Sequence, residues 1–168
     1  MFNGGGFLLD KVTIMSRKKF LEWQPPVSIE QVVAIRIGDR KPVKDIASNR
    51  YTDTMSLAFY DEWTFADEID RSTPVGSNRL TEKDKLIIDN FIDKYVDKYF
   101  VLHCEQGISR SPAIGYYILK RLGYTEELNE KKDSALYSPN IEVYGLLIGK
   151  PYTIETATEL REEINNLE

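Results

Sequence analysis

The residues with the clearest chemical potential in this chain are a cysteine and an arginine separated by five positions. Residues 103–111 read His-Cys-Glu-Gln-Gly-Ile-Ser-Arg-Ser. A cysteine thiolate is a strong nucleophile, and a guanidinium is a planar fork of N–H donors that matches two oxygens of a phosphate. The pairing of Cys104 with Arg110 therefore predicts attack on a phosphate ester.

The elements expected around this motif would place it in an anion-binding position. Residues 99–104 form an apolar run that predicts a buried strand, and Pro112 is typical of the first turn of a helix. A loop between a strand end and a helix start directs several backbone N–H groups toward one point, and the helix dipole adds positive potential there. The same field favours the thiolate of Cys104. We expect Gly107 to let the loop curl, and Ser111 to donate its hydroxyl to the departing thiolate.

The motif resembles the phosphate-binding loop of the cysteine-dependent protein phosphatases. Its Gly-Ile-Ser-Arg-Ser ending is most similar to the dual-specificity branch, which includes small atypical bacterial and phage members. The resemblance implies a phosphatase-like fold, a phosphocysteine intermediate and no metal or organic cofactor. It also implies catalytic roles for Cys104, Arg110 and Ser111. The phosphate would be bound by the backbone of the intervening loop, which comprises Glu105, Gln106, Gly107, Ile108, Ser109 and Arg110.

Hydrolysis of a phosphate ester also needs an acid, because an alkoxide is a poor leaving group until it is protonated. In the related phosphatases this acid is an aspartate that follows a neighbouring strand. Residues 55–60 predict such a strand and Asp61 follows it, so we expect Asp61 to be the acid and later the base that activates water. The alternatives are other carboxylates of the same loop: Glu62, Asp67, Glu68 and Asp70. The Trp-Pro-Asp signature of the tyrosine-specific branch is absent, since Trp63 follows Asp61 without an adjoining proline.

Strand and helix patterns alternate along the chain. Apolar runs predict four strands, at residues 12–15, 32–37, 55–60 and 99–104. Helices are expected after Thr81, which can form a capping box with Asp84, and at residues 112–121, 126–136, 139–149 and 154–167. This alternation indicates an α/β fold, with a central mostly parallel sheet of four to five strands flanked by helices. Ligands bind such sheets at the carboxyl ends of the strands, where Cys104 would lie.

Length and composition limit the class of protein. The chain has 168 residues, of which 42% are hydrophobic and 29% charged, so we expect one soluble domain over residues 1–168, with residues 1–9 as a tail or an edge strand. No stretch approaches the roughly 20 apolar residues of a membrane span, and the composition of residues 1–10 leads us to expect no secretory signal. A net charge of −5 argues against non-specific nucleic-acid binding. We expect no nucleic-acid or membrane partner, and we favour a monomer.

Cys104 is the only cysteine, which excludes disulfides and cysteine-rich metal sites and fits a reducing cytoplasm. Residues 11–50 carry nine Lys or Arg against four Asp or Glu. These basic residues predict a solvated surface, or a rim that steers phosphorylated substrate toward the loop. The rim candidates are Arg17, Lys18, Lys19, Arg36 and Arg40. Residues 71–79 are polar and turn-rich, which predicts a mobile flap or an inert connection.

His103 is the only histidine, and as the strand neighbour of Cys104 it would point to the opposite side. It is therefore unsuited to be the histidine base of a cysteine protease, and we expect it to brace the loop through backbone carbonyls.

Glu105 is the only charged residue between Cys104 and Arg110, which weighs against polyanionic substrates. We expect a phosphorylated protein or peptide as substrate, phosphotyrosine foremost. One alternative function is that of a catalytically inactive module, which binds phosphorylated partners without hydrolysing them. The other is an arsenate reductase, which would normally need further cysteines.

Overall fold

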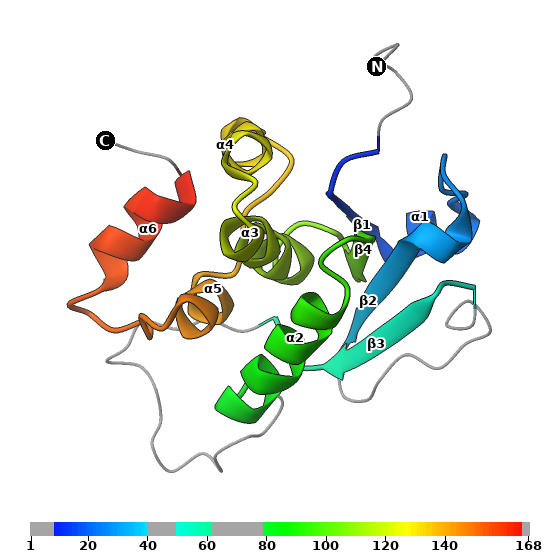
Figure 1. Cartoon of the computed structure of the whole chain (residues 1–168). Coiled ribbons are helices and arrows are strands. Elements are labelled where there is room, and N and C mark those ends of the chain that lie inside the picture. The colour runs from blue at the N-terminus through cyan, green and yellow to red at the C-terminus, as the bar shows by residue number, and fades with distance from the viewer. Residues whose placement is uncertain (1–8, 40–49, 62–78, 166–168) are drawn as a thin grey trace.

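The computed structural model describes residues 9–39, 50–61 and 79–165. Its centre is a sheet of four parallel strands in the order β1-β4-β2-β3. These strands are β1 (Val12–Ser16), β2 (Val32–Gly38), β3 (Asp53–Ala58) and β4 (Tyr99–Cys104). The expected α/β class and mostly parallel sheet are thereby confirmed, whereas likeness to phosphatases stays a prediction. Because the strands are parallel, their carboxyl ends share one edge, and Cys104 ends an interior strand there (Figure 1).

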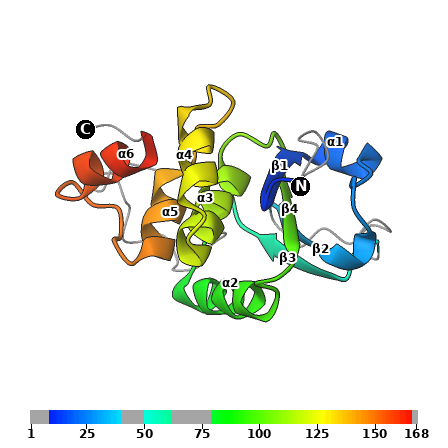
Figure 2. The same cartoon turned by 45° about the horizontal axis from the view of Figure 1, so that its top comes forward.

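Helices cover both faces of this sheet. The described helices are α1 (Arg17–Glu22), α2 (Glu82–Lys94), α3 (Arg110–Leu122), α4 (Thr125–Asp133), α5 (Ile141–Ile148) and α6 (Ala157–Asn165), with one 3₁₀ turn, η2 (Ile29–Gln31). Figure 2 shows α2 to α6 on one side of the sheet and α1 on the other. None of the helices in the described part of the chain has the length and apolar character that a membrane crossing requires.

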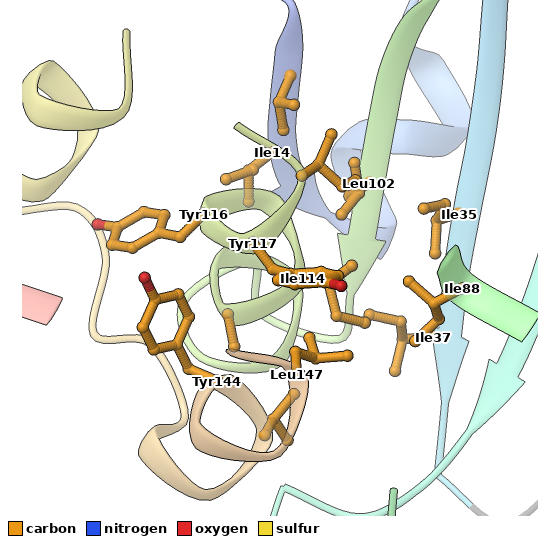
Figure 3. Packing of buried hydrophobic residues seen from close by; sticks show 14 of the residues in the cluster. Ile14, Ile35, Ile37, Ile88, Leu102, Ile114, Tyr116, Tyr117, Tyr144 and Leu147 are labelled. Atoms are coloured by element: carbon orange, nitrogen blue, oxygen red, sulfur yellow. The ribbon is translucent and has the colours of Figure 1, made fainter. Parts of the chain in front are cut away.

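The larger core lies between the sheet and helices α2, α3, α5 and α6. Alternate residues of each strand face it, so Ile35 and Ile37 of β2 and Leu102 of β4 belong to the same cluster as Ile114 of α3 (Figure 3). Helix α3 is buried from Arg110 to Leu119 and contacts β1 and β4. The other strand residues face a smaller apolar cluster around Phe20 of α1. Residues of opposite parity in β4, such as His103 and Cys104, therefore point into different layers, as the sequence predicts.

Burial raises the pKa of two phenols within the larger core, those of Tyr116 and Tyr144. Their rings come from α3 and α5 and lie close together in Figure 3. Each hydroxyl finds a partner, since Tyr116 donates to the carbonyl of Lys131 at 2.9 Å and Tyr144 to Glu163 at 2.7 Å. These bonds join α3 and α5 to the outer helices.

Most predicted boundaries lie close to the observed ones. Thr81 and Asp84 form the expected capping box of α2, and Gly123 ends α3 in the left-handed conformation with φ of 80°. Two differences affect the site. Helix α3 begins at Arg110 rather than Pro112, because Ser109 already accepts the first helical bond, from the Ala113 amide. Strand β3 ends at Ala58, which leaves two residues before Asp61.

Helix α1 was not expected, because it has only six residues and one of them, Phe20, is buried. Several expectations concern residues outside the described parts of the chain. They are the N-terminal tail over residues 1–8, the flap over residues 71–78, Arg40, Trp63, and the alternative acids Glu62, Asp67, Glu68 and Asp70.

Candidate active site

Cys104 lies at the carboxyl end of β4 with its sulfur surrounded by hydrogen-bond donors. Its side chain is 2% exposed. The sulfur is 3.1 Å from the hydroxyl oxygen of Ser111, and it accepts bonds from the backbone N–H groups of Gly107 at 3.3 Å and Ser111 at 3.5 Å. Donors from the middle and the end of the segment from Cys104 to Ser111, called the 104–111 loop below, thus converge on one sulfur. These donors could hydrogen-bond a negatively charged sulfur.

The curl of the 104–111 loop depends on Gly107. Its φ is 73°, a left-handed conformation that residues with a Cβ rarely adopt. A Cβ added there would lie 2.5 Å from the carbonyl carbon of Met15 and 2.7 Å from the nitrogen of Ser16. The loop therefore packs directly on the end of β1, and only glycine fits this contact.

Carbonyl groups of the 104–111 loop are bound by segments outside it. The carbonyl of Glu105 accepts from Arg17 at 3.2 Å, that of Ile108 from Ser138 at 2.8 Å, and that of Ser109 from Asn140 at 3.0 Å. Four backbone N–H groups of the loop have no hydrogen-bond acceptor in the described parts of the chain. They belong to Glu105, Gln106, Ile108 and Ser109. With its carbonyls occupied and these donors available, the loop is suited to bind an anion.

Arg110 is held by one end of its guanidinium. Its Nη1 donates to the carbonyl of Phe59 at 2.8 Å, to a carboxylate oxygen of Asp39 at 2.6 Å, and more weakly to the carbonyl of Gly38 at 3.4 Å. These acceptors follow the ends of β2 and β3. The Nε of Arg110 is buried and has no partner among the described residues, and the structure shows none for Nη2 there either. The Nε–Nη2 edge can therefore bind two oxygens of an oxyanion.

Asp61 lies against the loop, as its position after β3 predicts. Both of its hydrogen bonds within the described chain go to Oδ1, from the hydroxyl of Ser109 at 2.7 Å and the side-chain amide of Asn140 at 3.0 Å. The carboxylate is exposed. Its other oxygen, Oδ2, is then left to carry or take a proton. Asp61 is the one candidate acid that the structure describes.

Two residues of this arrangement were missed in the sequence. Asp39 directly follows the apolar run of β2, a position at the ligand-binding edge of a parallel sheet that should have drawn notice. Asn140 is 1% exposed and caps α5 by accepting from the Val143 amide at 3.0 Å. An asparagine before an apolar helical pattern is a recognisable cap, but its bond to Asp61 arises only from the tertiary fold.

The structure bears differently on each expectation for the basic residues and for the histidine. Arg36 is fully buried, so it cannot belong to a rim that steers substrate, and that prediction was wrong for this residue. It lies in β2, whose residues are covered on both faces. Lys18 and Lys19 are exposed and remain candidates for that rim.

His103 points away from Cys104 into the smaller cluster, and its Nδ1 is 3.4 Å from the carbonyl oxygen of Cys104, which fits the expected bracing role.

Comparison of the chain with protein-family models, with curated proteins and with solved structures finds no match. What the site can do is therefore inferred from its own residues. A thiol surrounded by donors, an arginine with one open edge and a carboxylic acid at the rim supply a nucleophile, an oxyanion clamp and an acid. Together these groups could support nucleophilic substitution at the centre of an oxyanion.

Proposed function

We propose that this protein is a cysteine-dependent phosphatase that hydrolyses phosphate monoesters on proteins, phosphotyrosine foremost. The observation that supports this most is the buried Nε of Arg110, which has no partner in the described chain and lies next to a loop in which four backbone amides also have no acceptor there. A buried donor without a partner costs free energy, about 1–3 kcal/mol, unless a ligand binds it. A tetrahedral dianion bound there would face the sulfur of Cys104.

The first step is attack of the Cys104 thiolate on phosphorus. A P–S bond forms while the ester P–O bond breaks, and charge builds on the equatorial oxygens. The loop amides and the open edge of Arg110 stabilise this charge. The proton on Asp61 moves to the departing oxygen, which leaves as an alcohol or a phenol.

The second step hydrolyses the phosphocysteine. Asp61, now ionised, takes a proton from water, whose oxygen attacks phosphorus as the P–S bond breaks. Inorganic phosphate is released and the thiolate of Cys104 reforms. The hydroxyl of Ser111, at 3.1 Å from the sulfur, stabilises the returning negative charge.

The substrate class follows from the surroundings of the loop. Glu105 is exposed and is the only charged side chain between Cys104 and Arg110, so a polyanionic lipid or nucleic acid would be repelled. A phosphoprotein segment carries less charge and fits better. Because the thiol must stay reduced, the reducing cytoplasm is the proposed location. A monomer suffices for this chemistry, and neither a metal nor an organic cofactor is required by it.

The direct experiment measures hydrolysis of phosphotyrosine and phosphothreonine peptides and a phosphoinositide by the protein and by Cys104→Ser. We expect turnover of phosphotyrosine above the others, inhibited by tungstate, and none by Cys104→Ser. The serine variant should still bind tungstate, because Arg110 and the loop amides remain. Tungstate binding without turnover by the unaltered protein would instead identify a module that only reads phosphorylated partners.

A further inference from the structure

A buried arginine lies directly behind the candidate site, on the face of the sheet that carries α1. Arg36 of β2 is opposite His103 in the ladder with β4, and both side chains are fully buried. The Nε of Arg36 donates to Nε2 of His103 at 2.8 Å. Both side chains pack on the ring of Phe20, the guanidinium at 4.7 Å and the imidazole at 4.6 Å.

This contact determines which nitrogen of His103 carries the proton. An arginine Nε in a protein always bears hydrogen, so the nitrogen of His103 that faces it must present a lone pair. The hydrogen of the neutral ring is then on Nδ1, which is 3.4 Å from the carbonyl oxygen of Cys104. A proton on Nε2 would place two N–H donors against each other. The hydrogen on Nδ1 is then available to the carbonyl oxygen of Cys104.

We propose that Arg36 is a positioning residue for the reaction, acting through His103. It sets the tautomer and the plane of the imidazole, and His103 in turn holds the carbonyl of Cys104 at the point where β4 enters the 104–111 loop. The nucleophile and the first loop amides are oriented by this chain of contacts. The consequence for catalysis rests on the proposed function, whereas the tautomer does not.

Packing alone does not account for an arginine at this position. The smaller cluster beside it consists of hydrophobic residues, among them Tyr51, whose pKa is raised by burial and lowered in part by Arg50 and Arg36. An apolar side chain would fill the space beside Phe20 without the desolvation cost of a guanidinium. The contact with His103 requires a hydrogen-bond donor at this position, which an apolar side chain cannot supply.

The tautomer can be measured in the unaltered protein. His103 is the only histidine, so the imidazole signals of a ¹⁵N-labelled sample belong to it without further assignment. We expect a protonated Nδ1 and an unprotonated Nε2 at neutral pH. A proton on Nε2, or on both nitrogens, would overturn the proposal whether or not the protein is a phosphatase.

The action on the loop is tested by tungstate affinity in a double-mutant cycle of Arg36→Met and His103→Gln. We expect each change to weaken binding about tenfold, the scale of one hydrogen bond, and the double variant to bind no more weakly than the weaker single one. If the two single losses of affinity multiply in the double variant, Arg36 does not act through His103, and the proposal is overturned. If the unaltered protein binds no tungstate, the proposed function fails, and the tautomer alone decides whether Arg36 acts on His103.

Two further variants separate the hydrogen bond from charge and packing. Arg36→Gln places an N–H donor at the same number of bonds from the backbone but removes the charge, and we expect it to bind tungstate more tightly than Arg36→Met. Equal weakening by Gln and Met would assign the effect to charge and contradict the positioning role. Arg50→Met is the control, because Arg50 packs on Tyr51 of the same cluster and donates to the carbonyl of Trp23 at 2.8 Å. It should leave tungstate affinity unchanged.

Discussion

Arg110 combines two tasks in a single guanidinium: Nη1 is anchored to the ends of β2 and β3, and the opposite edge is open to a ligand. A lysine has one nitrogen and cannot perform both. We expect Arg110→Lys to lower kcat for an aryl phosphate by about 100-fold, the loss typical of one oxyanion donor, despite the conserved charge. The matched control is Arg121→Lys on the same helix, whose partners are the exposed Asp93, the hydroxyl of Tyr117 and Asp89. An almost unchanged rate for Arg110→Lys would contradict the bidentate role.

Asp61 can be tested with little change of shape. In Asp61→Asn the oxygen that accepts from Ser109 and Asn140 is kept, but the transferable proton is lost. We expect hydrolysis of an alkyl phosphate to fall about 100-fold, and hydrolysis of an activated aryl phosphate much less, because a good leaving group needs no acid.

The control for the acid is Glu62→Gln, one residue further along the chain. It should leave the ratio of the alkyl rate to the aryl rate unchanged. If Glu62→Gln lowers that ratio and Asp61→Asn does not, the acid is Glu62.

At the scale of elements, the 104–111 loop depends on close contact with the end of β1. Gly107→Ala would bring a Cβ within 2.5 Å of the Met15 backbone, so the loop must move. We expect this variant to lose tungstate binding as measured by calorimetry. Gly123→Ala is the matched control, because Gly123 has φ of 80° but no atom within 4 Å of an added Cβ. It should cost stability, about 1 kcal/mol, and leave tungstate affinity intact. Retained binding by Gly107→Ala would contradict the described loop.

The strand, loop and helix that present Cys104 could be predicted because their signals are local in the chain. An apolar run, a glycine and a proline within a few residues fix β4, the loop and the start of α3. Helix α1 could not, because its single buried residue gives no periodic pattern. The anchoring of Arg110 by Asp39 joins residues 71 positions apart, and no local pattern encodes such a contact.

The buried Arg36 illustrates the same limit. In the sequence it is one basic residue of several, whereas its pairing with His103 requires the β2–β4 register. Net charge and composition apply to the chain as a whole, so they cannot show which basic side chain is buried.

At the scale of the whole molecule, helix α3 connects the site to the larger core. Ile118 is fully buried there, about two turns beyond Arg110. We expect Ile118→Ala to lower the free energy of unfolding by about 3 kcal/mol, and Tm by about 9 °C, because it leaves a cavity. Below its unfolding temperature the variant should keep the kcat of the unaltered protein, because the contacts of the 104–111 loop are unchanged. Leu86→Ala on α2, where the side chain is 62% exposed, should change stability by less than about 0.5 kcal/mol. Equal losses for the two variants, measured by thermal denaturation, would contradict the described core.

The most direct measurement of the central claim is mass spectrometry of the protein quenched in acid during turnover of an aryl phosphate. Because the chain has one cysteine, a phosphoryl group on sulfur can be located without ambiguity. We predict a phosphoryl group on Cys104 that builds up within the first turnover and is absent in Cys104→Ser. Sustained turnover with Cys104 unmodified, or with the phosphoryl group on another residue, would contradict the account.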